Sequence, residues 1–119
     1  MTGTVVEVGC GNGLNFDHYP STVERVLAVE PEPTLRRLAA DAAVAAPVPL
    51  RVVPGRAERL PADDQSADAV VFCLVMCSLP EWAHALAEVR RVLRPGGVVR
   101  FLEHCVSDDP RLRLGHARR

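Results

Sequence analysis

Three glycines alternate with other residues directly after the first apolar segment of this chain. Residues 5–14 read Val-Val-Glu-Val-Gly-Cys-Gly-Asn-Gly-Leu. Glycines in such a place let the backbone turn sharply and let a ligand lie against it with no Cβ in between. The sequence therefore predicts a nucleotide-binding turn after a buried strand, and the glycine spacing restricts which nucleotide it binds.

The spacing disfavours a dinucleotide. A dinucleotide turn reads Gly-x-Gly-x-x-Gly or Ala, and its third small residue lets a helix pack close to the strand. Counted from Gly9 that position is Leu14, and counted from Gly11 it is Phe16, so neither is small. Glu7, just ahead of the glycines, also disfavours a pyrophosphate because a carboxylate repels phosphates at short range. It suits a ligand that carries an ammonium group.

Five segments follow one another in the order found in one enzyme family. They are Glu7-x-Gly9-x-Gly11-x-Gly13, Val26-Leu-Ala-Val-Glu30, Gly55-Arg-Ala57-Glu58-x-Leu60-Pro61, Ala67-Asp-Ala-Val-Val-Phe-Cys73 and Leu93-Arg-Pro95-Gly96-Gly97. Together they span nearly the whole chain, which resembles the class I S-adenosylmethionine-dependent methyltransferases. The resemblance implies S-adenosyl-L-methionine as cofactor and methyl transfer as the reaction.

Strand-like and helix-like patterns alternate along the chain, as in an α/β protein whose parallel sheet has helices on both faces. Strands are expected at residues 4–8, 25–29, 50–53, 67–73 and 98–102. The resemblance implies a Rossmann-like sheet of about five strands in the order 3-2-1-4-5, without the last two strands of the full family fold. Residues 1–106 would form the methyltransferase core, and residues 107–119 a basic C-terminal segment.

Two helices are expected. The first spans residues 34–44, between two prolines, and its apolar side consists of Leu35, Leu38, Ala42 and Ala45. The second follows a capping box formed by Ser78 and Glu81. Its apolar stripe consists of Trp82, Leu86, Val89 and Leu93, and residues 94–97 end it in a tight turn. Glu88 and Arg91 are expected to face solvent.

The resemblance also implies roles for single residues. Glu30 lies 17 residues beyond Gly13, near the ~20-residue spacing at which an acidic side chain binds ribose hydroxyls. The family has Asp where this chain has Arg56, so the adenine contact is expected from the Ala57 backbone and the Glu58 side chain. By position, two further residues would border the methionine moiety or simply pack in the core: Cys73 and Leu74.

No catalytic residue stands out. Methyl transfer from a sulfonium is a displacement with a good leaving group, so positioning can supply most of the acceleration. Glu103 and His104 end the fifth strand on the side where α/β sheets hold ligands, and His18 and Tyr19 follow the glycines. His104 is the weak candidate for a base toward an acidic acceptor such as a thiol or phenol.

Composition restricts the partners. The 119 residues carry 14 Lys and Arg and 15 Asp and Glu, for a net charge of −1, whereas a nucleic-acid-binding domain normally has a basic face. The longest apolar run, residues 69–77, is shorter than the ~20 residues of a membrane helix, and no signal peptide is visible. The chain is therefore expected in the cytoplasm. Its four cysteines lack the paired spacing of a zinc site, so no metal is expected.

Two functions are compatible with these features. The first is methyl transfer to a small-molecule acceptor, because residues 74–80 and 101–104 resemble the family branch that includes thiol, quinone and phospholipid methyltransferases. The second is a truncated, catalytically inactive cofactor-binding fragment, because family members have a helix before the first strand and two strands after the fifth. An uncovered edge on the fifth strand would also favour self-association. A nicotinamide oxidoreductase is disfavoured by Leu14 and Phe16.

Overall fold

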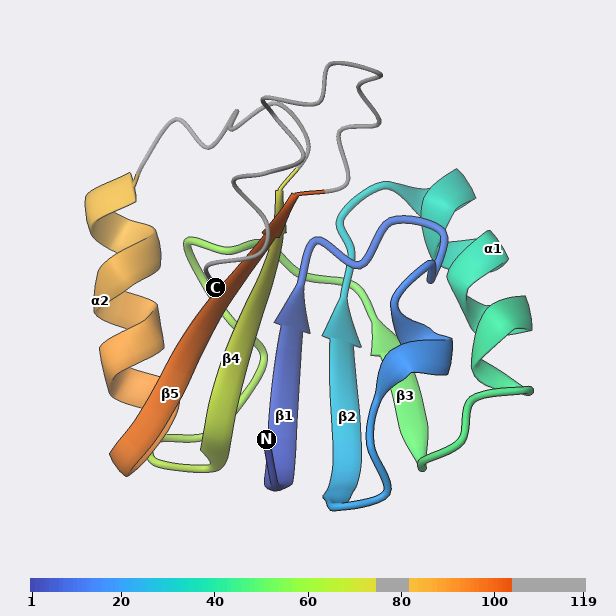
Figure 1. Ribbon diagram of the computed structural model, residues 1–119. Helices are drawn as coiled ribbons and strands as arrows, with labels where there is room; N and C mark the ends of the chain where they lie inside the picture. The colour runs from blue at the N-terminus through green and yellow to red at the C-terminus, as the bar shows by residue number, and fades with distance from the viewer. Residues whose placement is uncertain (75–81, 104–119) are drawn as a thin grey trace.

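The structure is a computed structural model that describes residues 1–74 and 82–103. Five parallel strands form one sheet in the order β3-β2-β1-β4-β5, and their carboxyl ends lie along one edge (Figure 1). The strands are β1 (Gly3–Val8), β2 (Val23–Val29), β3 (Leu50–Val53), β4 (Ala67–Leu74) and β5 (Leu93–Glu103). The predicted α/β class and strand order are confirmed. The first two strands begin one and two residues earlier than expected.

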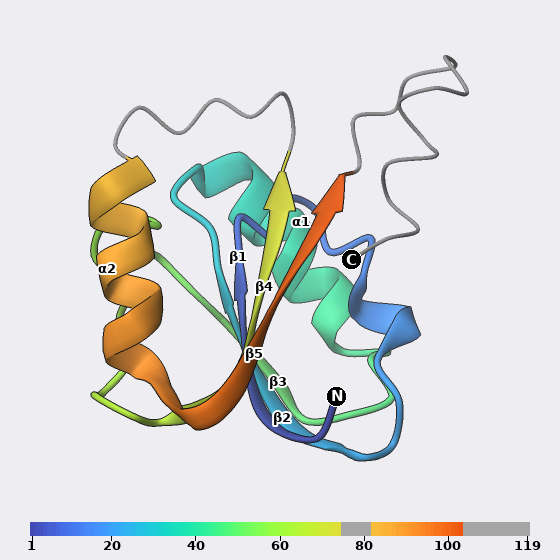
Figure 2. The same ribbon diagram turned by 60° about the vertical axis from the view of Figure 1, so that its left-hand side comes forward.

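The two α-helices, α1 (Pro33–Ala43) and α2 (Trp82–Val92), cover opposite faces of the sheet (Figure 2). Neighbouring side chains along a strand point to opposite faces, so β1 contributes to two cores. Val5 belongs to the cluster that contains Ala39 of α1, whereas Val6 belongs to the cluster that contains Val89 of α2. Each helix therefore buries an apolar side against the sheet.

The side of α1 that packs against the sheet differs from the predicted one. The helix begins at Pro33, and the Glu32 side chain caps it by accepting a hydrogen bond from the Leu35 amide at 2.7 Å. Ala39 is fully buried, whereas Leu35 and Leu38 are 37% and 49% exposed. The small alanine lets the helix lie close to the sheet. Of the predicted apolar side, Ala42 packs against the same cluster, and the prediction was wrong for Leu35 and Leu38.

The predicted stripe of helix α2 is confirmed at Val89, which is buried, and at Trp82 and Leu93, which pack against the same cluster, but not at Leu86. The buried residues are Ala85, Val89 and Val92, whereas Leu86 is 43% exposed. The helix ends at Val92, and Leu93 already pairs with Ala67 as the first residue of β5. Residues 94–97, expected as a tight turn, lie within β5 but bulge out of its pairing with β4: Leu93 pairs with Ala67 and Val98 with Ala69, and Gly96 has a φ of 84°. The predicted capping box lies outside the described residues.

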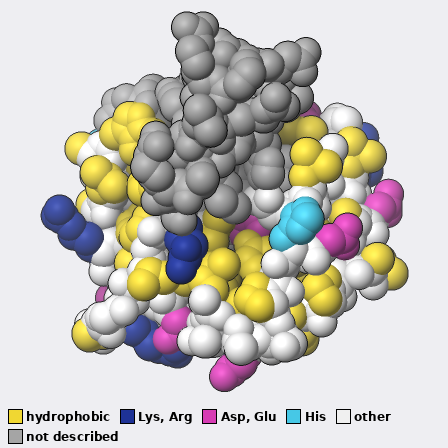
Figure 3. Space-filling view, viewed as in Figure 1, with side chains coloured by type: hydrophobic (Ala, Val, Ile, Leu, Met, Phe, Trp, Pro, Cys, Tyr) yellow, Lys and Arg dark blue, Asp and Glu magenta, His cyan; other side chains and the backbone are white. Residues whose placement is uncertain are grey.

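Charged side chains are spread over the described surface. On the face shown in Figure 3 the arginine side chains lie apart from one another, with exposed hydrophobic side chains between them. The two α-helices have 11 residues each, and neither is long and apolar enough to span a bilayer.

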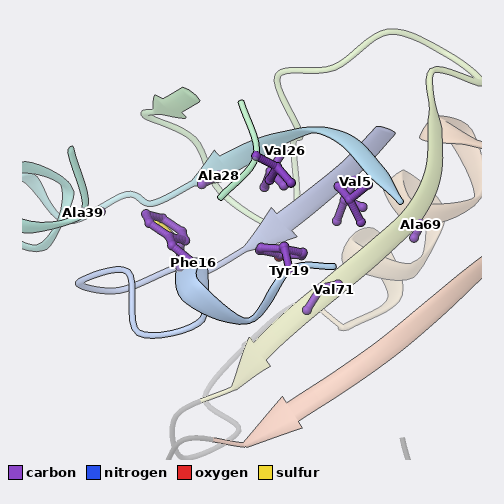
Figure 4. Packing of buried hydrophobic residues seen from close by; sticks show 11 residues of the cluster. Val5, Phe16, Tyr19, Val26, Ala28, Ala39, Ala69 and Val71 are labelled. Carbon is purple, nitrogen blue, oxygen red and sulfur yellow. The ribbon is translucent and has the colours of Figure 1, made fainter. Parts of the chain in front are cut away.

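The connection between β1 and β2, residues 9–22, contains no α-helix. Its only regular element is the 3-10 helix η1 (Phe16–His18). Parallel strands are usually joined through an α-helix that covers the sheet. Here the buried side chains of Phe16 and Tyr19 lie over the sheet instead, in the cluster with Val5, Val26 and Val71 (Figure 4). Two aromatic rings thus supply apolar cover for this face.

Candidate functional site

The glycine turn lies at the carboxyl edge of the sheet, next to the end of β2. The amides of Gly9 and Cys10 both donate to the carbonyl oxygen of Val29, at 2.8 and 3.2 Å. In the sheet, β1 has β2, the next strand of the chain, as one neighbour and β4 as the other. Open α/β sheets bind ligands at such a point, where successive connections diverge.

Glu30 joins the end of β2 to the glycine turn. Its Oε1 accepts a hydrogen bond from the Gly11 amide at 2.8 Å, and its Oε2 accepts one from the Glu32 amide at 3.0 Å. The side chain of Arg36 donates from Nη1 to the Glu30 carbonyl oxygen at 3.0 Å. An ionised carboxylate can accept about four hydrogen bonds. The Glu30 carboxylate is thus held in place while each oxygen retains acceptor capacity for a ligand hydroxyl.

The glycines of the turn have different surroundings. All three have positive φ angles, at 73° for Gly9, 59° for Gly11 and 90° for Gly13. A Cβ on Gly13 would lie 2.8 Å from the Phe16 ring and 2.9 Å from the Cβ of Ala42. A Cβ on Gly11 would have no described atom within 4 Å. Gly13 therefore permits close packing within the protein, whereas Gly11 faces space that a ligand can enter.

Glu7 lies below the turn and has no exposed surface. The Tyr19 hydroxyl donates a short hydrogen bond to its Oε1, and Asn15 Nδ2 lies 3.5 Å from its Oε2. The carboxylate therefore holds the connection between β1 and β2 in place. Direct pairing of Glu7 with a ligand ammonium group stays a prediction. Asn15 was missed in the sequence because a lone asparagine after glycines is an ordinary loop residue.

Two carboxylates lie near the Cys10 thiol in the turn. Burial, followed by the negative charges of Glu7 and Glu30, raises the pKa of the Cys10 thiol to about 12. The thiol is therefore protonated at neutral pH and is not a nucleophile. The same two carboxylates favour a positively charged ligand over a phosphate group.

A second turn, at residues 56–59, lies on the same edge beyond β3. The Arg59 amide donates to the Arg56 carbonyl oxygen at 3.1 Å, and between them Ala57 is buried and Glu58 is partly exposed. A Cβ on Gly55 would lie 2.9 Å from both Pro61 and Val29, so the segment packs against the end of β2. The structure therefore brings this turn to the same edge as Glu30.

The side chains of Glu88 and Arg91 are only 17% and 33% exposed and are bound to another segment, rather than facing solvent as expected. Glu88 Oε1 accepts a hydrogen bond from the Leu60 amide at 2.7 Å, and Arg91 Nη2 donates to the Leu60 carbonyl oxygen at 3.0 Å. The hydrogen bonds from Arg91 lower the pKa of the Glu88 carboxyl. The expectation was wrong because the connection between β3 and β4 lies against this side of α2.

The remaining candidates are placed only in part. The backbone of Cys73 and Leu74 ends β4 at the same edge, while their side chains and all of His104 lie outside the described residues. His18 is exposed at the end of η1. In the described ranges, no group of three or more His, Cys, Asp and Glu side chains could hold a metal ion.

Comparison with known proteins shows the family. A family model described as a methyltransferase domain matches residues 6–101. This chain belongs to the class I S-adenosylmethionine-dependent methyltransferases. The chain is 42% identical over 105 residues to human thiol S-methyltransferase TMT1B, a match that covers 84% of this chain and 42% of the relative. It is 32% identical over 114 residues to the demethylmenaquinone methyltransferase of Roseiflexus castenholzii, a match that covers 96% of this chain and 48% of that relative.

A solved structure supports the same fold. The YcgJ protein of Bacillus subtilis superposes with a TM-score of 0.74 at 27% identity, covering 93% of this chain and 48% of that one. The chain thus spans about half the length of the relatives it matches. Family and fold together imply S-adenosylmethionine as the cofactor.

Proposed function

We propose that this methyltransferase binds S-adenosyl-L-methionine at the carboxyl edge of the sheet and transfers its methyl group to a small-molecule acceptor. The arrangement of Glu30 beside Gly11 carries the proposal. A carboxylate with remaining acceptor capacity stands next to a glycine that faces open space. This pairing fits a ribose diol, and the two carboxylates near the turn fit a ligand with ammonium and sulfonium groups.

The residue roles follow the geometry of the edge. Glu30 would accept hydrogen bonds from the ribose hydroxyls, and Gly11 would let the ligand approach the backbone. The Ala57 amide and the Glu58 carboxylate would bind adenine. The remaining proposed cofactor-binding residues are Gly9 and Gly13 in the turn, Glu7 beneath it, and Cys73 and Leu74 at the end of β4.

The acceptor we propose to test first is a thiol, because the human relative is named a thiol S-methyltransferase. When bound, the cofactor supplies a methyl group on a positively charged sulfur. An ordinary thiol has a pKa of about 8.5, so only a few per cent is thiolate at pH 7. A base near the acceptor would increase that fraction, and His104 stays the candidate for it.

The alternative is a module that binds the cofactor without turnover. Calorimetric titration with S-adenosylhomocysteine and with NADH, together with transfer of a labelled methyl group to small thiols, separates the possibilities. Binding of S-adenosylhomocysteine with methyl transfer supports the proposal. Binding without transfer supports the module, and heat with NADH alone would contradict both.

Three further expectations from the sequence stay predictions. Among the described residues β5 pairs only with β4, and Val98 and Val99 are 43% and 37% exposed. We propose that this edge supports self-association, because an aliphatic strand edge is a template for pairing. A cytoplasmic location and the absence of a nucleic-acid partner also stay predictions.

A further inference from the structure

The Arg91 side chain of α2 is bound to the connection between β3 and β4. Its Nε and Nη2 donate to the two carboxylate oxygens of Glu88, at 2.7 and 2.9 Å. Its Nη1 donates to the Ala62 carbonyl oxygen at 2.9 Å and to Asp64 Oδ1 at 2.8 Å, and Nη2 also donates to the Leu60 carbonyl oxygen. A guanidinium has five N–H donors, and these contacts use all of them.

Glu88 completes the attachment. Its Oε1 accepts from the Leu60 amide, so the pair binds both the N–H and the C=O of one residue. Two more hydrogen bonds follow along the chain, from the Gln65 amide to the Arg91 carbonyl oxygen and from the Ser66 amide to the Val92 carbonyl oxygen, both at 2.8 Å. The connection is therefore fastened to α2 over residues 60–66.

Leu60 lies directly after the turn at residues 56–59. Its side chain is 4% exposed and packs in the cluster that includes Ala57 and Val29. The other end of the segment is restricted by Gly55, which lies close to Pro61. Contacts at Gly55 and at Leu60 thus fix the position of the turn at residues 56–59, and the contacts at Leu60 include those from α2.

We propose that Glu88 and Arg91 are positioning residues for the adenine end of the cofactor site. By holding Leu60, they hold Ala57 and Glu58 where the base is bound. This inference rests on the proposed function, because it assumes a purine at that turn. It assigns a cofactor-related role to two charged residues of α2 that do not themselves contact the ligand.

The test compares two ligands that differ only in the base: S-adenosylhomocysteine and S-inosylhomocysteine, in which hypoxanthine replaces adenine. Arg91→Lys keeps the charge but lacks the planar set of donors. Glu88→Gln is the milder second variant, used if Arg91→Lys fails to fold. Arg90→Lys is the matched control, because Arg90 is exposed on the same helix. Affinities are measured by calorimetry on the full chain, below the melting temperature of every variant.

We expect Arg91→Lys to weaken S-adenosylhomocysteine binding about tenfold, the loss produced by one charged hydrogen bond. The ratio of the two affinities should fall toward one, while Arg90→Lys leaves both unchanged. An unchanged ratio, or a wild type with no preference between the bases, overturns the inference. A wild type that binds neither ligand contradicts the proposed function instead.

Discussion

The backbone amide of Gly11 donates a hydrogen bond to Glu30 Oε1 across 2.8 Å and so joins the glycine turn to the end of β2. The two residues lie 19 positions apart in the chain. Glu30 is 5% exposed, and its second oxygen is held by the Glu32 amide. This contact preorganises the part of the site where we place the ribose.

Replacing Glu30 should weaken cofactor binding. Glu30→Ala removes a charged acceptor, so we expect S-adenosylhomocysteine to bind about 1.5–3 kcal/mol more weakly by calorimetry. Glu24→Ala is the control, because Glu24 is an exposed glutamate near the start of β2, the strand that Glu30 follows. An unchanged affinity together with a lower melting temperature would show that Glu30 acts only in the fold.

The two glycines of the turn should respond differently to a methyl group. In Gly13→Ala the new Cβ meets Phe16 and Ala42, and overpacking of this kind costs about 1–3 kcal/mol beyond the strain of a positive φ. In Gly11→Ala only the strain of about 1–2 kcal/mol applies, but the methyl group enters the ligand space. Urea unfolding should show Gly13→Ala as the less stable variant. Equal stability of the two variants would contradict the described packing.

The hydrogen bond between Tyr19 and Glu7 should contribute to stability. Tyr19→Phe removes a donor to a fully buried carboxylate, and a buried polar group that loses its partner costs about 1–3 kcal/mol. Glu7→Gln should cost less when Tyr19 is already Phe. A double-mutant cycle in urea should therefore give a coupling energy above about 0.5 kcal/mol. Additive effects would show that the two side chains do not interact.

The Cys10 thiol should resist alkylation in the folded chain. Its side chain is buried. Its pKa is raised from 9.0 to about 12, so the thiolate is scarce at pH 8. Iodoacetamide at pH 8, followed by peptide mass spectrometry, should modify Cys10 only after unfolding. Between pH 9 and 12 the thiol ionises in the unfolded chain before it does so in the folded chain. Its contribution to the free energy of unfolding therefore falls as pH rises through this range. Rapid labelling of the folded chain would contradict the described burial.

The edge of β5 should promote association. We expect the apparent mass in light scattering to rise with protein concentration, and Val98→Lys to reduce the rise because a charge on an edge strand opposes pairing. Val44→Lys is the matched control, because Val44 is 87% exposed and follows α1. A concentration-independent monomer, or an equal effect of both substitutions, would rule out the β5 edge as the interface.

Local sequence patterns determined much of this protein. The five strands, their order through the family resemblance, the glycine turn and the place of Glu30 were all predicted, because apolar runs and glycines act within a few neighbouring residues.

The tertiary structure decided which side of each element is used. Ala39 rather than Leu38 is buried because the distance between α1 and the sheet sets how large a side chain fits. Arg91 is bound rather than solvated because the β3–β4 connection lies against α2. Glu7 is buried because Tyr19 lies over the sheet in a connection without an α-helix. Each outcome depends on a neighbour distant in the chain, and no local pattern in the sequence records such a neighbour.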